Sequence, residues 1–187
     1  GDTQMSGNQY VSAVRLGAKS TDVNAGRFIR FDDVYIANTE STPYNDFVGD
    51  VRIEGLRPIG DRPTHQWTTS VGTVHYNMID DLTPDTSDYI TSDTIGNIDL
   101  FSVSPLLTPS ANILAITPNM YARKVNAGVA RVAAVVNQAG STATGQDQYL
   151  TQEYRYHYND VWATNPIDNS AWGETLSGVY FGVKKSG

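Results

Sequence analysis

Three histidines could act as a general base near neutral pH: His65, His75 and His157. A hydrolase would need one of them beside a nucleophile, and none lies in a Gly-x-Ser-x-Gly elbow or a similar motif. His157 alternates with tyrosines, which predicts a solvent-facing position on a strand. A glycosidase would need two cooperating carboxylates, but the neighbouring Asp32 and Asp33 point to opposite faces of a strand. We therefore expect a protein without enzymatic activity.

The segment from 80 to 93 is acidic and almost free of apolar residues, so it is predicted to be an exposed loop. Calcium prefers carboxylate and carbonyl oxygens, which makes a calcium ion one hypothesis for this loop. Its spacing matches no EF-hand, and aspartates also favour turns because they hydrogen-bond nearby backbone, so a solvated loop is the other hypothesis. No phosphate-binding loop or dinucleotide fingerprint is present, and no organic cofactor is predicted. The candidate calcium ligands are Asp80, Asp81, Asp85 and Asp88, with a weaker second group in Asp32 or Asp33, Asp46 and Asp50.

Tyrosines alternate along the segment from 149 to 162 and form the strongest aromatic pattern in the chain. Leu150 shares a face with three of these tyrosines, while the opposite face is polar, so the tyrosine face is predicted to point inward. Aromatic side chains in such a position would belong to the core or to a subunit interface, whereas exposed ones could stack on sugar rings. The candidate interface or glycan-contact residues are Tyr154, Tyr156, Tyr158 and Trp162.

The elements that would position these residues are strands. Thr, Ser, Asn, Gly and Tyr outweigh Lys and Glu, and this composition favours strands and turns over helices. Runs with period-two alternation end in Gly, Pro, Asn or Asp clusters, which predicts an all-β fold, an antiparallel β-sandwich of jelly-roll type. One short helix is expected over 167–176, packed by Trp172 and Leu176. The predicted strands cover 9–16, 27–37, 48–57, 64–69, 73–79, 95–103, 111–124, 128–138, 148–160 and 178–184.

Two hairpins are predicted in the second half of the chain. The first joins 112–124 to 129–138 across Val125-Asn126-Ala127-Gly128, where Asn and Gly tolerate the positive φ of a tight turn. The second continues from 128–138 through a turn at 140–145 into 148–160. The stretch 129–136 is apolar on both faces except for Arg131, which is typical of a central strand covered on each side.

Length and charge exclude several classes of protein. The chain has 187 residues, 13 Lys and Arg against 20 Asp and Glu, a net charge of −7 and no cysteine. The acidic balance argues against nucleic-acid binding, and the lack of cysteine excludes disulfides and thiolate metal sites. No apolar run is long enough to predict a membrane helix. The sequence begins Gly-Asp-Thr-Gln without an initiator Met, and we expect a preceding segment to be missing.

Three stretches together resemble a family of tailed-bacteriophage virion structural proteins: Arg30-Phe31-Asp32-Asp33-Val34-Tyr35-Ile36, then Asn45-Asp46-Phe47-Val48-Gly49-Asp50-Val51-Arg52-Ile53, then Asn165-Pro166 leading to Trp172. In that family a sequence motif like the first ends a concanavalin-like (laminin-G-like) module, and a motif like the second begins another β module. The resemblance implies closing strands of a concanavalin-like module over 1–40 and a jelly-roll-like sandwich over 45–187. It carries no catalytic residues.

The function that this resemblance implies is structural. The expected protein lies on the surface of a virion, as a capsid decoration or tail-associated protein, and acts through protein–protein interfaces. Its expected partners are other capsid or tail proteins and further copies of itself, with a trimer as the state that virion symmetry suggests. The alternative is a carbohydrate-binding module that recognises host surface glycans through tyrosine or tryptophan, aided by a calcium ion.

Overall fold

The computed structural model of the chain describes residues 51–108, 112–158 and 161–187. The chain divides into two compact units, Gly1–Ile53 and Glu54–Gly187, and the described fold is that of the second. The predicted strands 9–16 and 27–37, the predicted module 1–40 and the second aspartate group lie outside the described residues. Residues 51–57, the described part of the predicted strand 48–57, are not in a strand.

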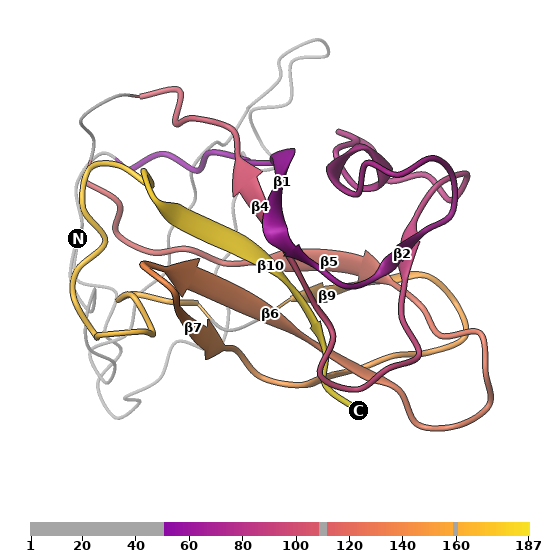
Figure 1. The fold of residues 1–187 in the computed structure, drawn as a ribbon. Coiled ribbons are helices and arrows are strands. Elements are labelled where there is room, and N and C mark those ends of the chain that lie inside the picture. The colour runs from indigo at the N-terminus through magenta and orange to yellow at the C-terminus, as the bar shows by residue number, and fades with distance from the viewer. Residues whose placement is uncertain (1–50, 109–111, 159–160) are drawn as a thin grey trace, which may run out of the picture. The chain divides into compact units, whose positions relative to one another are not determined.

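Six strands form one antiparallel sheet that is the framework of this unit (Figure 1). Its order is β1-β4-β10-β6-β7, and β8 pairs with the other end of β6. All of these pairings are antiparallel, which confirms the predicted antiparallel β class. The strands are β1 (Pro58–His65), β4 (Ile98–Val103), β6 (Arg131–Gln138), β7 (Ser141–Thr144), β8 (Gln148–Tyr149) and β10 (Val179–Lys185).

Strand β6 is the central strand that its sequence predicts. Five consecutive residues from Val132 to Val136 are at most 2% exposed, so both faces of the strand are covered. β10 lies on one side of β6, and β7 and β8 share its other side. A strand that is buried on both faces needs apolar side chains at successive positions, and Val and Ala supply them.

β10 approaches β4 very closely at Gly182. A Cβ atom built on this glycine would lie 1.8 Å from the carbonyl oxygen of Asp99 and 3.1 Å from the Cα atom of Leu100. Both neighbours are backbone atoms of β4, which cannot swing aside as a side chain can. Glycine is therefore required here by the close approach of two strands.

Two short ribbons lie beside the large sheet. β5 (Asn119–Ala122) pairs with β9 (Arg155–Tyr158), and β2 (Thr68–Thr69) pairs with β3 (Ile90–Thr91). The only helical turn in the described part of the chain is a 3₁₀ turn, η2 (Tyr76–Met78). None of the described residues forms a helix long and apolar enough to cross a membrane.

An isolated bridge between Ile116 and Trp162 connects the β5–β9 ribbon to the core. The two residues exchange backbone hydrogen bonds of 3.1 and 2.8 Å. Trp162 is 8% exposed and belongs to the hydrophobic cluster formed with Ala134 and Val136 of β6. The core thus lies between one face of the large sheet and a second layer that contains this bridge.

The predicted helix over 167–176 is wrong, because the chain makes one turn at 166–168 and continues as irregular structure. Asn165 accepts a hydrogen bond from Ile167 N through its side chain and one from Asn169 N through its backbone. Asn169 has a φ of 60°, in the left-handed region that ends a right-handed helical turn. The expected packing of Trp172 and Leu176 is confirmed, since both belong to or contact the core cluster.

The predicted hairpin between 112–124 and 129–138 is also wrong. β5 pairs with β9 instead, because both long sides of β6 are taken by β10, β7 and β8. β6 does continue into a hairpin with β7, but the turn comes earlier than predicted, at Ala139 and Gly140, whose φ values are 49° and 85°. Two successive positive φ values suit the right-handed twist of a two-residue hairpin.

Other strand predictions are confirmed in part. Strands β4, β6 and β10 match the predictions over 95–103, 128–138 and 178–184. The predicted strand 148–160 splits into β8 and β9, which belong to different sheets. The prediction over 73–79 is wrong, because η2 occupies that segment.

Candidate functional site

The β5–β9 ribbon presents a row of tyrosine rings to solvent. Tyr121 of β5 lies opposite Tyr156 of β9, with ring centroids 5.0 Å apart. Tyr156 and Tyr158 are two positions apart on one face of β9, and their rings stack at 6.0 Å. The three side chains are 38%, 51% and 63% exposed in chain order. We call these residues and the adjoining Tyr154 the tyrosine patch.

Tyr154, the residue that precedes β9, completes the patch. Its ring stacks on Tyr121 with centroids 5.2 Å apart, and it is only partly buried. The guanidinium carbon of Arg123 lies 4.8 Å from the centre of the Tyr154 ring, within the range of a cation–π contact. These contacts restrict the rings before any partner arrives, so that binding would cost less side-chain entropy.

The predicted inward orientation of the tyrosine face is wrong. The buried residue of β9 is His157, which is 9% exposed, while Tyr156 and Tyr158 point outward. His157 lies opposite the partly buried Met120 of β5, so this pair forms the covered part of the ribbon, while Arg155 of β9 is exposed. Alternation along a strand defines two faces, but which face is covered depends on the layer that packs against it.

Trp162 does not belong to the exposed patch. It is buried in the core cluster, and its backbone carbonyl accepts a 2.6 Å hydrogen bond from the indole Nε1–H of Trp172. The prediction that Trp162 contacts a glycan or a partner directly is therefore not supported by its position. Of the four predicted aromatics, only the tyrosines lie together at the surface.

The acidic loop brings three of its four predicted ligands together. Carboxylate oxygens of Asp81, Asp85 and Asp88 lie within 4.8 Å of one another, and Asp80 is outside this group. The predicted exposed loop over 80–93 is confirmed in part, because Ile90–Thr91 form β3 and the residues before them are largely exposed. Its carboxylates offer oxygen ligands of the kind that calcium prefers. Close packing of like charges disfavours ionisation: partial desolvation and the carboxylates of Asp85, Asp88 and Asp80 raise the pKa of Asp81.

Asp85 behaves in the opposite way within the same loop. Its Oδ1 accepts hydrogen bonds from the backbone N–H and the hydroxyl of Ser87, at 2.8 and 2.9 Å. These bonds stabilise the charged form and lower the pKa of Asp85. This is the local geometry of an aspartate turn, which by itself explains why aspartates are dense in this loop.

A buried carboxylate at Asp99 organises a site that the sequence analysis missed. Asp99 is 0% exposed, and its Oδ1 accepts hydrogen bonds from the backbone N–H groups of Gln66 and Trp67, at 2.6 and 2.8 Å. Its Oδ2 lies 2.6 Å from Nδ1 of His75, and the His75 ring lies 5.2 Å from that of His65. The sequence did contain one sign of this site, an Asp between apolar residues at the start of strand β4. A charge buried in a strand requires hydrogen-bonding partners from elsewhere in the fold.

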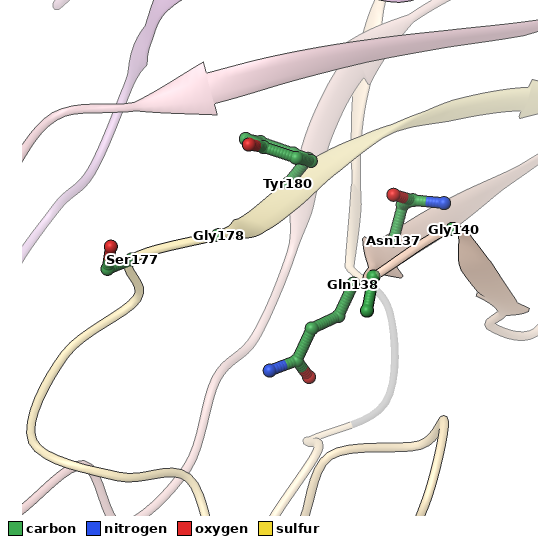
Figure 2. A pocket seen from close by; sticks show the side chains of 7 residues that line it. Asn137, Gln138, Gly140, Ser177, Gly178 and Tyr180 are labelled. Atoms are coloured by element: carbon green, nitrogen blue, oxygen red, sulfur yellow. The ribbon is translucent and has the colours of Figure 1, made fainter.

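An open pocket of about 400 Å³ lies at the β6–β7 turn and the start of β10 (Figure 2). Asn137, Gln138, Ser177 and Tyr180 line it together with glycines, and Figure 2 shows no acid, histidine or lysine among the labelled side chains. Nδ2 of Asn137 donates to Thr142, and Oε1 of Gln138 accepts from Asn165, so both amides are held by the protein itself. This pocket offers hydrogen bonds but no pair of groups for acid–base chemistry.

No family model, no curated protein and no solved structure matches this chain.

Proposed function

We propose that this chain is a non-enzymatic structural protein of a tailed-phage virion, placed on the particle surface as a capsid decoration or tail-associated protein. It works by forming interfaces with other virion proteins and with copies of itself, in a trimer. The large sheet and the layer that carries β5 and β9 form a β-sandwich of jelly-roll type over 45–187, preceded by the closing strands of a concanavalin-like module over 1–40. The resemblance of the sequence motifs at 30–36 and 45–53 to those of tailed-phage virion proteins supports this assignment.

The tyrosine patch is the observation that carries the interface part of the proposal. Tyrosine combines a large apolar ring with a hydroxyl, and it is enriched where proteins contact one another. Three rings with 38% to 63% of their surface exposed form a row that further burial would stabilise. Ring–ring contacts of 5.0 and 6.0 Å already order the row, as expected for a rigid contact surface.

The test has two arms. Quantitative mass spectrometry of purified particles should find the chain, with hundreds of copies indicating decoration of the capsid and a few dozen or fewer indicating the tail. Light scattering of the purified chain should give a multiple of the 20.4 kDa monomer mass, and Tyr156→Ser combined with Tyr158→Ser should reduce that mass. Tyr149→Ser is the matched control, because Tyr149 is 66% exposed but lies outside the patch. Particles without the chain would overturn the virion assignment.

A second candidate function is carbohydrate binding, which the same exposed rings favour because the face of an aromatic ring can stack on a pyranose. In this case the acidic loop would hold a calcium ion through Asp81, Asp85 and Asp88, whose oxygens lie within 4.8 Å of one another. A glycan array and a calcium titration of the melting temperature distinguish this candidate from the first. Flat responses in both experiments would remove it.

A further inference from the structure

His65 and His75 meet where the end of β1 crosses β4. His65 is the last residue of β1, and its Cα pairs with that of Asp99 in β4, so the two side chains lie on the same face of the sheet. His75 comes from the loop that follows β2 and reaches the Asp99 carboxylate at 2.6 Å. Asp99 thereby relates two imidazole rings from segments ten residues apart, His65 through strand pairing and His75 through the carboxylate.

The hydrogen bonds of both rings define which nitrogen carries the proton. Nδ1 of His65 lies 2.8 Å from the backbone carbonyl oxygen of Arg62, which can only accept, so this nitrogen donates. Nδ1 of His75 faces Oδ2 of Asp99, whose other oxygen already accepts two backbone N–H groups. Both neutral rings therefore carry hydrogen on Nδ1 and leave the lone pair of Nε2 unused, and no described residue hydrogen-bonds either Nε2 atom.

This arrangement is the one that metal-binding histidines adopt. A ligating imidazole donates its second N–H to a carboxylate or a backbone carbonyl, which orients the ring and makes the ligating nitrogen more basic. His75 has the carboxylate of Asp99 in this place, and His65 has the carbonyl of Arg62. The two partners that hold the rings are thus the two kinds found behind metal ligands.

The spacing of the rings fits a shared ion. Two imidazoles bound to one tetrahedral zinc ion at about 2.0–2.1 Å have centroids roughly 5 Å apart. The centroids of His65 and His75 are 5.2 Å apart, and their planes are inclined by 59°.

Burial leaves one side of the pair open. Asp99 is fully buried and His75 is 8% exposed, whereas His65 is exposed at the surface. An ion bound between the rings would keep water at its remaining positions. Imidazole nitrogen suits Zn²⁺, Cu²⁺ and Ni²⁺, while calcium prefers the oxygen ligands of the acidic loop.

We propose that His65 and His75 form a two-histidine site for a divalent transition-metal ion, with Asp99 as a positioning residue behind His75. The site is separate from the tyrosine patch and does not depend on the proposed virion function.

Calorimetric titration of the untagged, chelator-treated full chain with ZnCl₂ tests the proposal. We expect one ion per chain, and His65→Gln should weaken binding at least tenfold; His65 is exposed, so this variant should keep the fold. The control is the double variant Asp81→Asn and Asp85→Asn, which disables the acidic loop and should leave zinc binding unchanged. A chain that binds no Zn²⁺, or that binds it equally well without His65, would overturn the proposal. Loss of binding in the acidic-loop variant alone would overturn it as well.

Asp99→Asn separates the positioning role from general stability. An amide at this position can donate to Nδ1 of His75, which moves the ring proton to Nε2 and occupies the ligating lone pair. Zinc affinity should then fall by roughly 10–100-fold, the range typical for loss of a partner behind a metal ligand. Nitrogen-15 NMR of the imidazoles should show protonated Nδ1 on both rings in the wild-type chain and protonated Nε2 on His75 in the variant. Wild-type rings protonated on Nε2 would contradict the proposed site.

Discussion

Replacing Asp99 with alanine should cause a large loss of stability. The carboxylate is 0% exposed and accepts three hydrogen bonds, from Gln66 N, Trp67 N and Nδ1 of His75, at 2.6, 2.8 and 2.6 Å. Asp99→Ala leaves three donors in a buried place without their acceptor. These bonds hold the segment after β1 and the loop around η2 against β4, so their loss acts on the fold as a whole.

The expected loss follows from the number and kind of bonds. Hydrogen bonds to a charged group contribute about 1.5–3 kcal/mol each, and the cost of burying the carboxylate offsets part of their sum. Removing one partner of a buried ionic contact typically costs about 3–5 kcal/mol, so we expect a loss near 4 kcal/mol. For a chain of this size such a loss lowers the melting temperature by roughly 8–16 °C.

Urea denaturation and differential scanning calorimetry measure this loss. Asp93→Ala is the matched control, because it removes an exposed aspartate from the loop between β3 and β4. This substitution should change the free energy of unfolding by less than about 0.5 kcal/mol. Asp99→Asn should fall between the two, since it keeps an acceptor for the backbone donors. If Asp99→Ala and Asp93→Ala shift the unfolding midpoint equally, the three bonds do not stabilise the fold and the reasoning fails.

Three further predictions concern other parts of the fold. Gly182→Ala should prevent folding or abolish the cooperative unfolding transition, because its Cβ would lie 1.8 Å from a backbone oxygen of β4. Gly173→Ala is the control and should be tolerated, because Gly173 has open space around it. Equal expression and equal melting temperatures of the two variants would contradict this prediction. Trp172→Ala should lower the free energy of unfolding by about 3–5 kcal/mol in a urea titration, since it removes a large core side chain that is 4% exposed. A loss below about 1 kcal/mol would show that the stability of the core does not depend on Trp172. Ser87→Ala should raise the pKa of Asp85 only part of the way toward its ordinary value of 3.8 in a carboxyl NMR titration, because it removes the bond from the Ser87 hydroxyl and keeps the bond from the backbone N–H, which is the larger cause of the lowered pKa. The stability linked to these bonds is present above pH 3.8 and is lost as the pH falls through the lowered pKa. An unchanged Asp85 titration in Ser87→Ala would refute the role of the hydroxyl bond.

The strands that carry strong apolar patterns were predictable from the sequence. Val132–Val136 has to be covered on both faces wherever it lies, because five successive Val and Ala residues have no polar side to expose. The exposed acidic loop and the packing of Trp172 and Leu176 followed from composition in the same way. In each case the residue types decide the environment by themselves, because apolar side chains have to be buried and a run of aspartates has to be hydrated.

The candidate sites depended more strongly on tertiary structure. The sequence predicted that the tyrosine face points inward, and this orientation is wrong, because β9 pairs with β5 and buries His157 instead. The expected helix failed at Asn169, where a left-handed backbone conformation ends the turn. His65 and His75 carried no motif, and only the fold brings them together, because His65 pairs with Asp99 across the sheet and His75 reaches the Asp99 carboxylate.

By itself, the sequence determined that this protein is built of antiparallel strands with a central apolar strand and polar turns, since alternation and turn residues act over a few neighbouring positions. Only the tertiary structure decided which strands pair, which face of the β5–β9 ribbon meets solvent, and which histidines meet Asp99. These choices depend on contacts between residues far apart in the chain: Asp99 binds Gln66, Trp67 and His75 from 24 to 33 positions away. A pattern of period two is unchanged when a ribbon is turned over, and burial against the rest of the fold removes that ambiguity.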